Sequence, residues 1–491
     1  MKTKIKGKYV VGYENGRHVM MRDACVVYEG DTIQYVGKEN SQNIDQVIDA
    51  SEMLVCPGFV NLHSHLQIHA NAIMLADVGN KDVYGSGILS TVPKESQVEG
   101  KSTISTLVGV SSDGKGEKWK IGPELALAQL LRNGTTTVVD VGTYAPDIDA
   151  MVDLVGRSGM RAYLGLDYSS AHYYYDDSFV LRYRWNEERG EKGLKDALAF
   201  IKKYDGAFHG RIGGYLSPSS DTTVSPSLLK KTAEIARSDN LRIEIHSCQT
   251  LFEFQEILRR HHKTPIEFFH DLNFLSPQTI LGHCVFVSGH SMTAYPNGGD
   301  LDLIRDSHAS VAHSPLVFSR RGIAMESFSK YRKKGINVGV GTDTYLKDII
   351  TEMRHVSFTS KIVEGDFSVA TAEDVFNAAT LGSSKALGRE DIGRLAKGKK
   401  ADIIIIDLNK IHIGPYRDPI KALINNANGN DVHTVIIDGE IRVKDGKVLG
   451  VDERDLLRRA QTFAEETWST VRNRDARGRT ADEISPLCLK G

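Results

Sequence analysis

Pro57-Gly58-Phe59-Val60-Asn61-Leu62-His63-Ser64-His65 is a short apolar run that ends in two histidines separated by one residue. Alternate residues of a β-strand point to the same face, so the run predicts a strand that presents His63 and His65 side by side. Two neutral imidazoles on one face make half of a metal site. A lone His-x-His pair is a weak signal, and two ordinary histidines are the other interpretation until further ligands are found.

Downstream of this run, apolar strands alternate with amphipathic helices. Seven further strands are predicted to end at Val139-Asp140, Leu164-Gly165, Tyr215-Leu216, Ile245-His246, Leu281-Gly282, Val311-Ala312 and Gly341-Thr342. Such alternation is typical of a parallel sheet, and eight strands over roughly 340 residues fit an α/β fold of the (β/α)8 TIM-barrel type. An open, doubly wound sheet is the alternative, but no Gly-x-Gly-x-x-Gly motif follows the first strand.

Both ends of the chain have the pattern of short strands and turns. Residues 1–56 include the turn dipeptide Asn15-Gly16, and residues 398–450 include the apolar run Ile403-Ile404-Ile405-Ile406. We expect the two ends to meet in one small β-sandwich domain, because isolated hairpins are marginally stable. The chain would then consist of this composite domain, a metal-binding barrel over residues 57–397, and a C-terminal helix and tail over residues 451–491.

Composition and charge are those of a large globular protein. The 491 residues carry 61 basic and 63 acidic side chains, so the formal net charge of −2 excludes nucleic-acid binding through bulk charge. No apolar run approaches the ~20 residues that span a bilayer, and no apolar stretch follows the charged start Met1–Lys6. The five cysteines are scattered, which argues against a disulfide scaffold. We therefore expect a cytoplasmic protein that binds neither nucleic acid nor membrane.

Three more predicted strands end in residues that could complete a metal site. His246 ends the fifth strand, His283 ends the sixth, and Asp343 follows the eighth. The carboxyl ends of barrel strands meet at one rim, where the active sites of this fold lie. Three imidazole nitrogens, a carboxylate oxygen and a water molecule are a plausible set of ligands for zinc or a similar divalent ion.

Together these motifs resemble those of the metal-dependent amidohydrolase superfamily, over nearly the whole chain. The likeness is to the branch that includes S-adenosylhomocysteine/methylthioadenosine deaminases, guanine deaminases and the triazine chlorohydrolases and aminohydrolases. Besides the first strand and His246, it is carried by residues 131–140, Gly282-His283-Cys284, Gly341-Thr342-Asp343 and residues 393–402.

The resemblance implies a hydrolase that cleaves a non-peptide C–N bond of a small cyclic or aromatic substrate with metal-activated water. His63, His65, His246 and Asp343 would hold one divalent metal ion. Zn²⁺ is expected first, although the same ligands accept Fe²⁺, Co²⁺ or Mn²⁺. Residues 211–217 contain no lysine, which favours one metal over the lysine-bridged pair of other relatives. The resemblance also implies a homodimer or a higher homo-oligomer.

Asp343, His283 and Gln249 are the candidate catalytic residues. Asp343 would be the general base, and His283 would bond the attacking water or the substrate. Deaminases of this branch carry His-x-x-Glu after the fifth strand, and the Glu shuttles a proton. Here the run is His246-Ser247-Cys248-Gln249, and an amide cannot transfer a proton. Gln249 either contacts the substrate or only caps the following helix.

The candidate substrate contacts are Gln67, Gln249, His283 and His313. Residues 66–122 lack periodicity, and so long a connection predicts a binding loop. The substrate-binding His and Glu of purine-nucleoside deaminases have no counterpart near residues 217–221 or after His65. These departures favour amine, amide or urea-type bonds. Hydrolytic dehalogenation and purine or pyrimidine-type deamination are the alternatives on the same scaffold, and a non-catalytic ligand-binding relative is a remote one.

Overall fold

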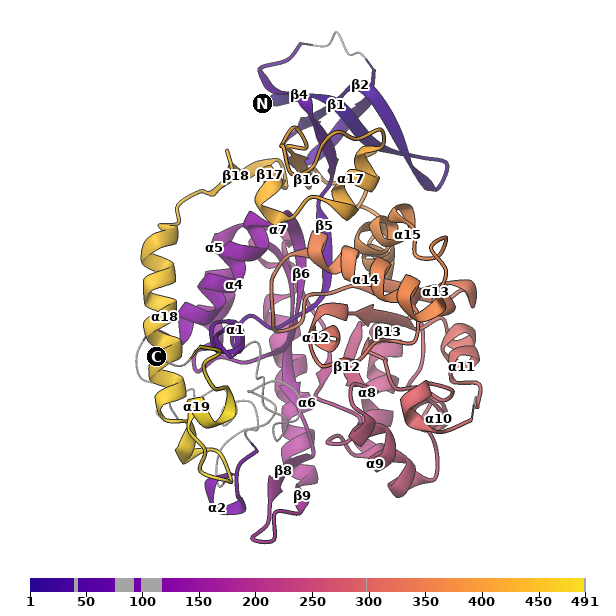
Figure 1. Ribbon diagram of the computed structural model, residues 1–491, viewed down its shortest axis with the longest axis vertical. Helices are drawn as coiled ribbons and strands as arrows, with labels where there is room; N and C mark the ends of the chain where they lie inside the picture. Colours follow the sequence, from indigo (N-terminus) through magenta and orange to yellow (C-terminus); the bar gives the residue numbers. More distant parts are fainter. Residues whose placement is uncertain (39–42, 76–91, 99–116, 297, 490–491) are drawn as a thin grey trace.

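A computed structural model describes residues 1–38, 43–75, 92–98, 117–296 and 298–489, and shows a β-sheet at one end of a larger α/β body (Figure 1). The α/β body contains two parallel sheets, with strand orders β10-β7-β6-β5, where β11 also pairs with β7, and β12-β13-β14-β15. The strands are β5 (Phe59–Ser64), β6 (Thr135–Thr143), β7 (Arg161–Tyr168), β10 (Ile212–Gly214), β11 (Ser217–Pro218), β12 (Ile243–Ser247), β13 (Thr279–His283), β14 (Ser310–His313) and β15 (Asn337–Val340).

Isolated parallel bridges connect the two sheets at both edges. Ser64 on β5 pairs with Asp343 beyond β15, and Leu216 and Ser220, which flank β11, pair with Ile243 and His246 on β12. The fold is therefore α/β of the TIM-barrel type, as predicted. In the described residues its strands form two sheets joined by isolated bridges and not one continuously hydrogen-bonded barrel.

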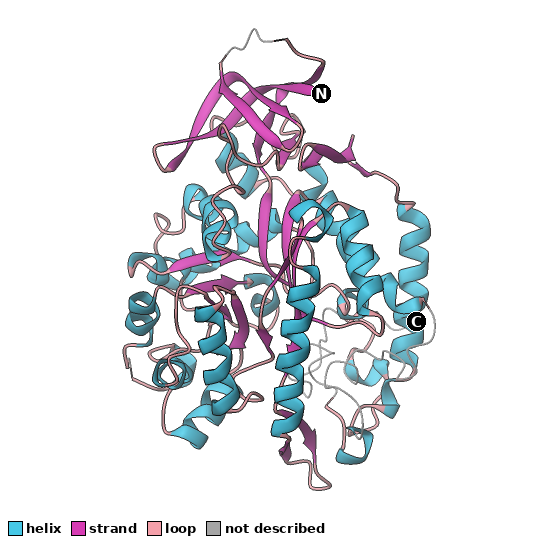
Figure 2. Ribbon diagram, turned by 180° about the vertical axis from the view of Figure 1, so that it is seen from behind, coloured by secondary structure: helices cyan, strands magenta, loops and turns pink. Residues whose placement is uncertain are grey.

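Helices connect successive strands and cover their outer faces (Figures 1 and 2). The Ser225 hydroxyl accepts a hydrogen bond from the Leu228 N–H, and Pro226 begins the helix that follows. The longer helices are α4 (Ile121–Arg132), α5 (Ile148–Ser158), α6 (Glu187–Tyr204), α8 (Pro226–Ser238), α9 (Leu251–His261), α11 (Asp300–Ser307) and α14 (Ile349–Glu364). The shorter ones are α7 (Ala207–Gly210), α10 (Pro265–Asp271), α12 (Pro315–Ser319), α13 (Phe328–Lys333), α15 (Ala372–Asn377), α16 (Ser383–Ala386) and α17 (Pro419–Asn425).

The two ends of the chain meet in one sheet of order β19-β18-β17-β16-β4-β1-β2-β3. Its strands are β1 (Lys2–Glu14), β2 (Arg17–Glu29), β3 (Thr32–Gly37), β4 (Gln46–Pro57), β16 (Ile403–Ile406), β17 (Val432–Ile437), β18 (Glu440–Lys444) and β19 (Lys447–Val448). The join is the antiparallel pairing of β16 with β4, where Ile404 lies opposite Cys56. Because all eight strands belong to a single sheet, the predicted two-sheet sandwich is not confirmed.

The apolar run on β16 is buried on both of its faces. Ile404 and Ile406 belong to the large core of the α/β body, whereas Ile403 and Ile405 pack in a second core with Val10 and Val55. A strand covered on both sides is apolar throughout rather than alternating, which explains four consecutive isoleucines.

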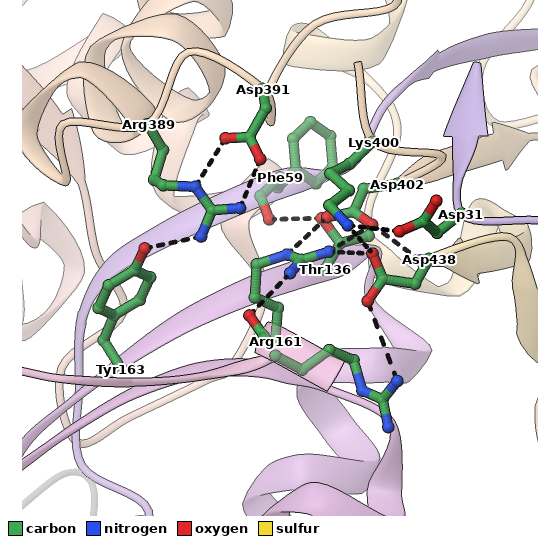
Figure 3. A network of polar contacts seen from close by, with 12 residues as sticks. Asp31, Phe59, Thr136, Arg161, Tyr163, Arg389, Asp391, Lys400, Asp402 and Asp438 are labelled. Atoms are coloured by element: carbon green, nitrogen blue, oxygen red, sulfur yellow. Dashed lines mark hydrogen bonds and ion pairs between the residues drawn. The ribbon is translucent and has the colours of Figure 1, made fainter. Parts of the chain in front are cut away.

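An ionic network ties the terminal sheet to the amino end of β7 (Figure 3). The Arg161 side chain is 1% exposed, and its Nε and Nη2 atoms lie 3.0 and 3.2 Å from the two carboxylate oxygens of Asp402. Arg161 Nη2 also lies 2.5 Å from Asp438 Oδ1, and the Asp438 N–H donates to Asp402 Oδ1. Each charged group of this trio therefore has an oppositely charged partner.

The predicted C-terminal helix is α18 (Glu453–Ser469), which Asp452 caps by accepting hydrogen bonds from two backbone N–H groups. It runs beside α4 and α1 (His69–Met74) along one side of the molecule (Figure 1). The tail returns to it through α19 (Ala481–Ile484), whose Ile484 is buried against Trp468. No helix in the described part of the chain is long and apolar enough to cross a membrane.

Most of the predicted binding loop, residues 66–122, falls on segments 76–91 and 99–116, which lie outside the described residues. The described remainder of this stretch includes α1, α2 (Glu95–Val98) and the start of α4.

Candidate metal centre and active site

The carboxyl ends of β5, β12, β13 and β15 bring four histidines and an aspartate together. His65 Nε2 lies 3.3 Å from His246 Nε2 and 3.6 Å from Asp343 Oδ1, and His283 Nε2 lies 3.7 Å from Asp343 Oδ2. The ring of His63 is 5.1 Å from that of His246 and 4.4 Å from that of His283, between centroids. The five predicted residues therefore share one small volume, and their potential ligand atoms group within 4.8 Å in two overlapping triads.

Each of the three histidines expected to bind the metal is held through its Nδ1 atom. The acceptors are Glu244 Oε1 at 2.7 Å for His63, Val141 O at 2.8 Å for His65 and Ser219 O at 2.9 Å for His246. A backbone carbonyl only accepts, so Nδ1 of His65 and His246 carries the proton and Nε2 keeps its lone pair. Histidines that bind metals are oriented in the same way by outer hydrogen bonds.

The donor set fits a divalent metal ion. The buried Nε2 atom of His63 has no hydrogen-bond partner among the described residues. A buried polar atom is costly when it is unpaired, and a metal would satisfy this one. Three imidazole nitrogens and a carboxylate oxygen are a common coordination set for zinc.

Asp343 and His283 differ in charge. Burial raises the pKa of Asp343, but the positive charges that His63, His65 and His246 can carry outweigh burial, and the net pKa is lowered. Burial lowers the pKa of His283 well below its ordinary value, so this ring is neutral. Neither ring nitrogen of His283 has a hydrogen-bond partner within the described part of the chain. An ionised carboxylate thus lies beside a neutral imidazole that can both donate and accept.

Glycines allow the ligand strands to approach closely. A Cβ atom at Gly341 would lie 2.7 Å from the Cβ and backbone O of His63, and one at Gly282 would lie 3.1 Å from His63 Cε1. His283, which follows Gly282, and Asp343, two residues after Gly341, have φ angles of 72° and 51°. Such left-handed backbone is costly for non-glycine residues and concentrates at functional sites. Close packing against His63 therefore explains why glycine precedes His283 and occurs two residues before Asp343.

A buried lysine fixes the backbone around the site. Lys347 is 0% exposed, and its Nζ atom donates to Ser64 Oγ at 2.9 Å and to the backbone O of Asp343. It thereby links the His63-Ser64-His65 turn to the strand end that carries Asp343. Burial lowers the pKa of Lys347 to about 7, although Asp343 and neighbouring carboxylates oppose the shift. Sequence reasoning missed this residue, because nothing periodic relates Lys347 to the other motifs.

Gln67 and Gln249 make local contacts next to the site. The Gln67 amide nitrogen donates to Asp140 Oδ2 at 2.8 Å, which anchors the start of the segment after His65. The backbone N–H of Gln249 donates to Glu253 Oε2 at 2.7 Å. Thr250 is the N-cap of α9, so the interpretation of Gln249 as the helix cap is wrong.

His313 is buried at the end of β14. A positive charge on His313 would lower the pKa of His283. Its Nδ1 atom has no hydrogen-bond partner in the described segments. His313 therefore lies at the end of the strand next to the one that carries His283.

Glu244 is a functional residue that the sequence could have indicated. It precedes His246 by two residues on β12, so both side chains point to the same face, and it contacts His63. Burial raises the pKa of Glu244 well above its ordinary value, and the nearby Asp140 and Asp343 carboxylates add to this. A carboxyl group this deeply buried is expected only where it has a partner.

Comparison with known proteins gives consistent matches. The profile of the amidohydrolase family matches residues 54–442. A 5'-deoxyadenosine deaminase of Methanosarcina acetivorans is 30% identical over 455 residues, which are 91% of this chain and 94% of that protein. A 5-methylthioadenosine/S-adenosylhomocysteine deaminase of Thermococcus onnurineus is 30% identical over 449 residues, which are 91% and 95% of the two chains.

Solved structures share the fold. The crystal structure of an adenosine deaminase from Xanthomonas campestris with bound zinc superposes with a TM-score of 0.76 at 20% identity, covering 95% of this chain and 98% of that one. Atrazine chlorohydrolase from Arthrobacter aurescens complexed with zinc gives 0.77 at 23% identity, covering 94% and 100%. The family match and the named relatives support metal-dependent hydrolysis of a C–N bond other than a peptide bond in a small substrate, and the chain belongs to the amidohydrolase family.

Proposed function

We propose that the chain is a mononuclear aminohydrolase or amidohydrolase that acts on a small cyclic or aromatic substrate. One divalent metal ion, with Zn²⁺ as the first choice, would be held by His63, His65, His246 and Asp343. The observation that carries this proposal is the convergence of three Nδ1-anchored histidines on one ionised carboxylate. The absence of a lysine from residues 211–217 supports one metal rather than a bridged pair.

The chemistry follows from the groups around Asp343. A bound divalent metal would supply Lewis acidity, which lowers the pKa of a water ligand toward neutrality. Asp343 would accept the proton of the attacking water as general base, since its two oxygens face His65 and His283. The water oxygen adds to the carbon that bears the nitrogen. The neutral His283 would form a hydrogen bond to the group on which charge develops, and would relay the proton taken up by Asp343 to the nitrogen, which leaves as the C–N bond breaks.

Gln249, His283 and His313 are the proposed substrate contacts. Gln249 lies three residues after the ligand His246 and offers an amide where many deaminases of the branch have a proton-transferring carboxylate. Gln67 is a fourth candidate, and it would have to use its amide oxygen, because its nitrogen already donates to Asp140.

Deamination of a purine nucleoside is the second candidate function. It is favoured by the relatives that are 30% identical over nine-tenths of the chain, which are named as nucleoside deaminases. In that case His283 and Asp343 would have to perform all proton transfers, because Gln249 cannot.

We further propose that the strands of the α/β body form one closed (β/α)8 barrel, in which β10 and β11 together make the fourth strand, and the bridges at both sheet edges support this. Its limits would be residues 57–397, beside a composite domain of residues 1–56 and 398–450 and a C-terminal unit of residues 451–491. A cytoplasmic location and assembly into a homodimer or higher homo-oligomer are proposed on family resemblance. Light scattering of the purified protein tests the assembly.

The deciding experiment incubates the metal-loaded protein with a mixed library of amino-heterocycles, nucleosides, amides, ureas and chloro-heterocycles, followed by mass spectrometry. Exchange of an amino group for a hydroxyl identifies an aminohydrolase, and cleavage of an amide or urea identifies an amidohydrolase. The His63→Ala variant is the matched control. Metal analysis should give one ion per chain, and two ions would contradict the mononuclear site.

A further inference from the structure

Two adjacent arginines follow α12, and their side chains contact different aromatic rings. Arg320 is exposed, and its Cζ atom lies 4.6 Å from the centre of the Tyr345 ring. Arg321 is half-buried, and its Cζ atom lies 5.8 Å from the centre of the Phe318 ring. A tight turn, in which the Arg321 N–H donates to Phe318 O, holds Arg321 next to that ring.

Phe318 separates Arg321 from the catalytic groups. Its ring is 1% exposed and meets the His283 ring edge-on, with 5.1 Å between centroids. The Arg321 guanidinium is therefore only one aromatic ring away from His283. Its positive charge is felt at the site, where it contributes to lowering the pKa of both His283 and Asp343.

The guanidinium of Arg321 has no protein partner among the described residues. Its Nε atom is buried without a hydrogen bond, and no carboxylate of the described segments lies within 4.0 Å of it. Arg161 is the contrast, because its buried guanidinium is paired with two carboxylates. A partly buried guanidinium that is unpaired is costly, and an oxyanion that binds it would remove this cost.

We propose that Arg321 is a specificity-determining residue that binds a carboxylate of the substrate. This inference rests on the proposed function and narrows its substrate class to small C–N compounds that carry a carboxylate beside the reactive ring or chain. The planar guanidinium fork matches the two oxygens of a carboxylate. The Phe318 ring lies between this subsite and His283, so it would set the spacing between the carboxylate and the bond that is cleaved.

The test measures binding by isothermal titration calorimetry to the metal-loaded protein. The probes are matched pairs that differ only in charge, namely 6-aminonicotinate with 6-aminonicotinamide and 4-aminobenzoate with 4-aminobenzamide. We expect the wild-type protein to bind the acids about 10- to 100-fold more tightly than the amides, as a hydrogen bond to a charged group does. Arg321→Met should abolish this preference, and Arg321→Lys should retain part of it.

Arg320→Met is the matched control, because it removes a neighbouring arginine whose guanidinium is already occupied by the Tyr345 ring, and it should keep the full preference. Metal content and thermal midpoint show that each variant is folded. Equal or weaker binding of the acids to the wild type, including no binding of either member at millimolar concentration, overturns the proposal. So does a preference that survives in Arg321→Met. The binding measurement does not require turnover. A failure of the proposed hydrolase function would be recognised separately, because incubation with the substrate library would give no products.

Discussion

The buried polar groups at the two ends of the parallel strands differ in whether they have a partner in the protein. At the amino end of β7, Arg161 is paired with Asp402 and Asp438 and joins the body to the terminal sheet. At the carboxyl ends, His63 Nε2 and both nitrogens of His283 are buried without partners among the described residues. In barrel enzymes the first end serves stability and the second serves catalysis. Here the difference can be seen in the hydrogen-bond pairing itself.

The largest expected effect is on the residues at the carboxyl ends of the strands. His63→Ala or Asp343→Ala removes one of the four proposed metal ligands, and should lower kcat/KM by at least about 10³-fold, because metal activation of water is lost. Steady-state kinetics and metal analysis of the purified variants check this. Activity that persists in a variant without bound metal would refute the proposed mechanism.

At the amino end of β7, Arg161→Met should change the stability of the protein and not its activity. Removing the guanidinium leaves the buried Asp402 without its cation and Asp438 with only the more distant Lys400 and Arg211, so the free energy of unfolding should fall by about 3–5 kcal/mol. Chemical denaturation measures the loss, and kcat/KM of the folded fraction should not change. Lys192→Met is the control, since its exposed pair with Asp196 should contribute less than about 0.5 kcal/mol. A tenfold fall in kcat/KM of folded Arg161→Met would show that the two ends are coupled.

Glu244→Gln tests the comparison further. Glu244 lies toward the carboxyl ends of the strands, but unlike His283 it has a hydrogen-bond partner, which is His63. The amide keeps the size of the side chain but replaces the carboxyl group that orients the His63 ring, so metal affinity should fall about 10- to 100-fold. Competition with a chelator measures this affinity. Unchanged metal affinity together with lower stability would mean that Glu244 only fills space.

The smallest effect concerns a histidine at the junction of the terminal sheet with the body. Burial, aided by Arg394, lowers the pKa of His18 from 6.5 to about 4, so between these values the unfolded chain binds more protons. Stability should therefore fall as the pH falls from 6.5 to 4, by at most about 1.4 kcal/mol per pH unit. His18→Gln should lower this slope in denaturation measured across the window. An identical slope in both proteins would contradict a buried neutral His18.

Much of the site could be predicted because it follows the period of the strands. His63, His246, His283 and Asp343 each end or follow an apolar run, and parallel strands bring such ends together. Lys347 and Arg321 could not be predicted, since their importance arises from burial and from missing partners in three dimensions. The isoleucines of residues 403–406 indicated a place in the composite β domain, but not that the α/β body would cover one face of their strand.

The pairing of β4 with β16 has a consequence for synthesis on the ribosome. The edge of β4 at Leu54–Pro57 must wait for residues 403–406 to emerge before it gains its antiparallel neighbour. At about 5–20 residues per second, this delay is on the order of tens of seconds. During that time β1, β2 and β3 can already pair with β4 or with one another, while the apolar edge of β4 stays open. Nascent chains stalled before residue 403 should therefore be bound by chaperones that recognise exposed strands.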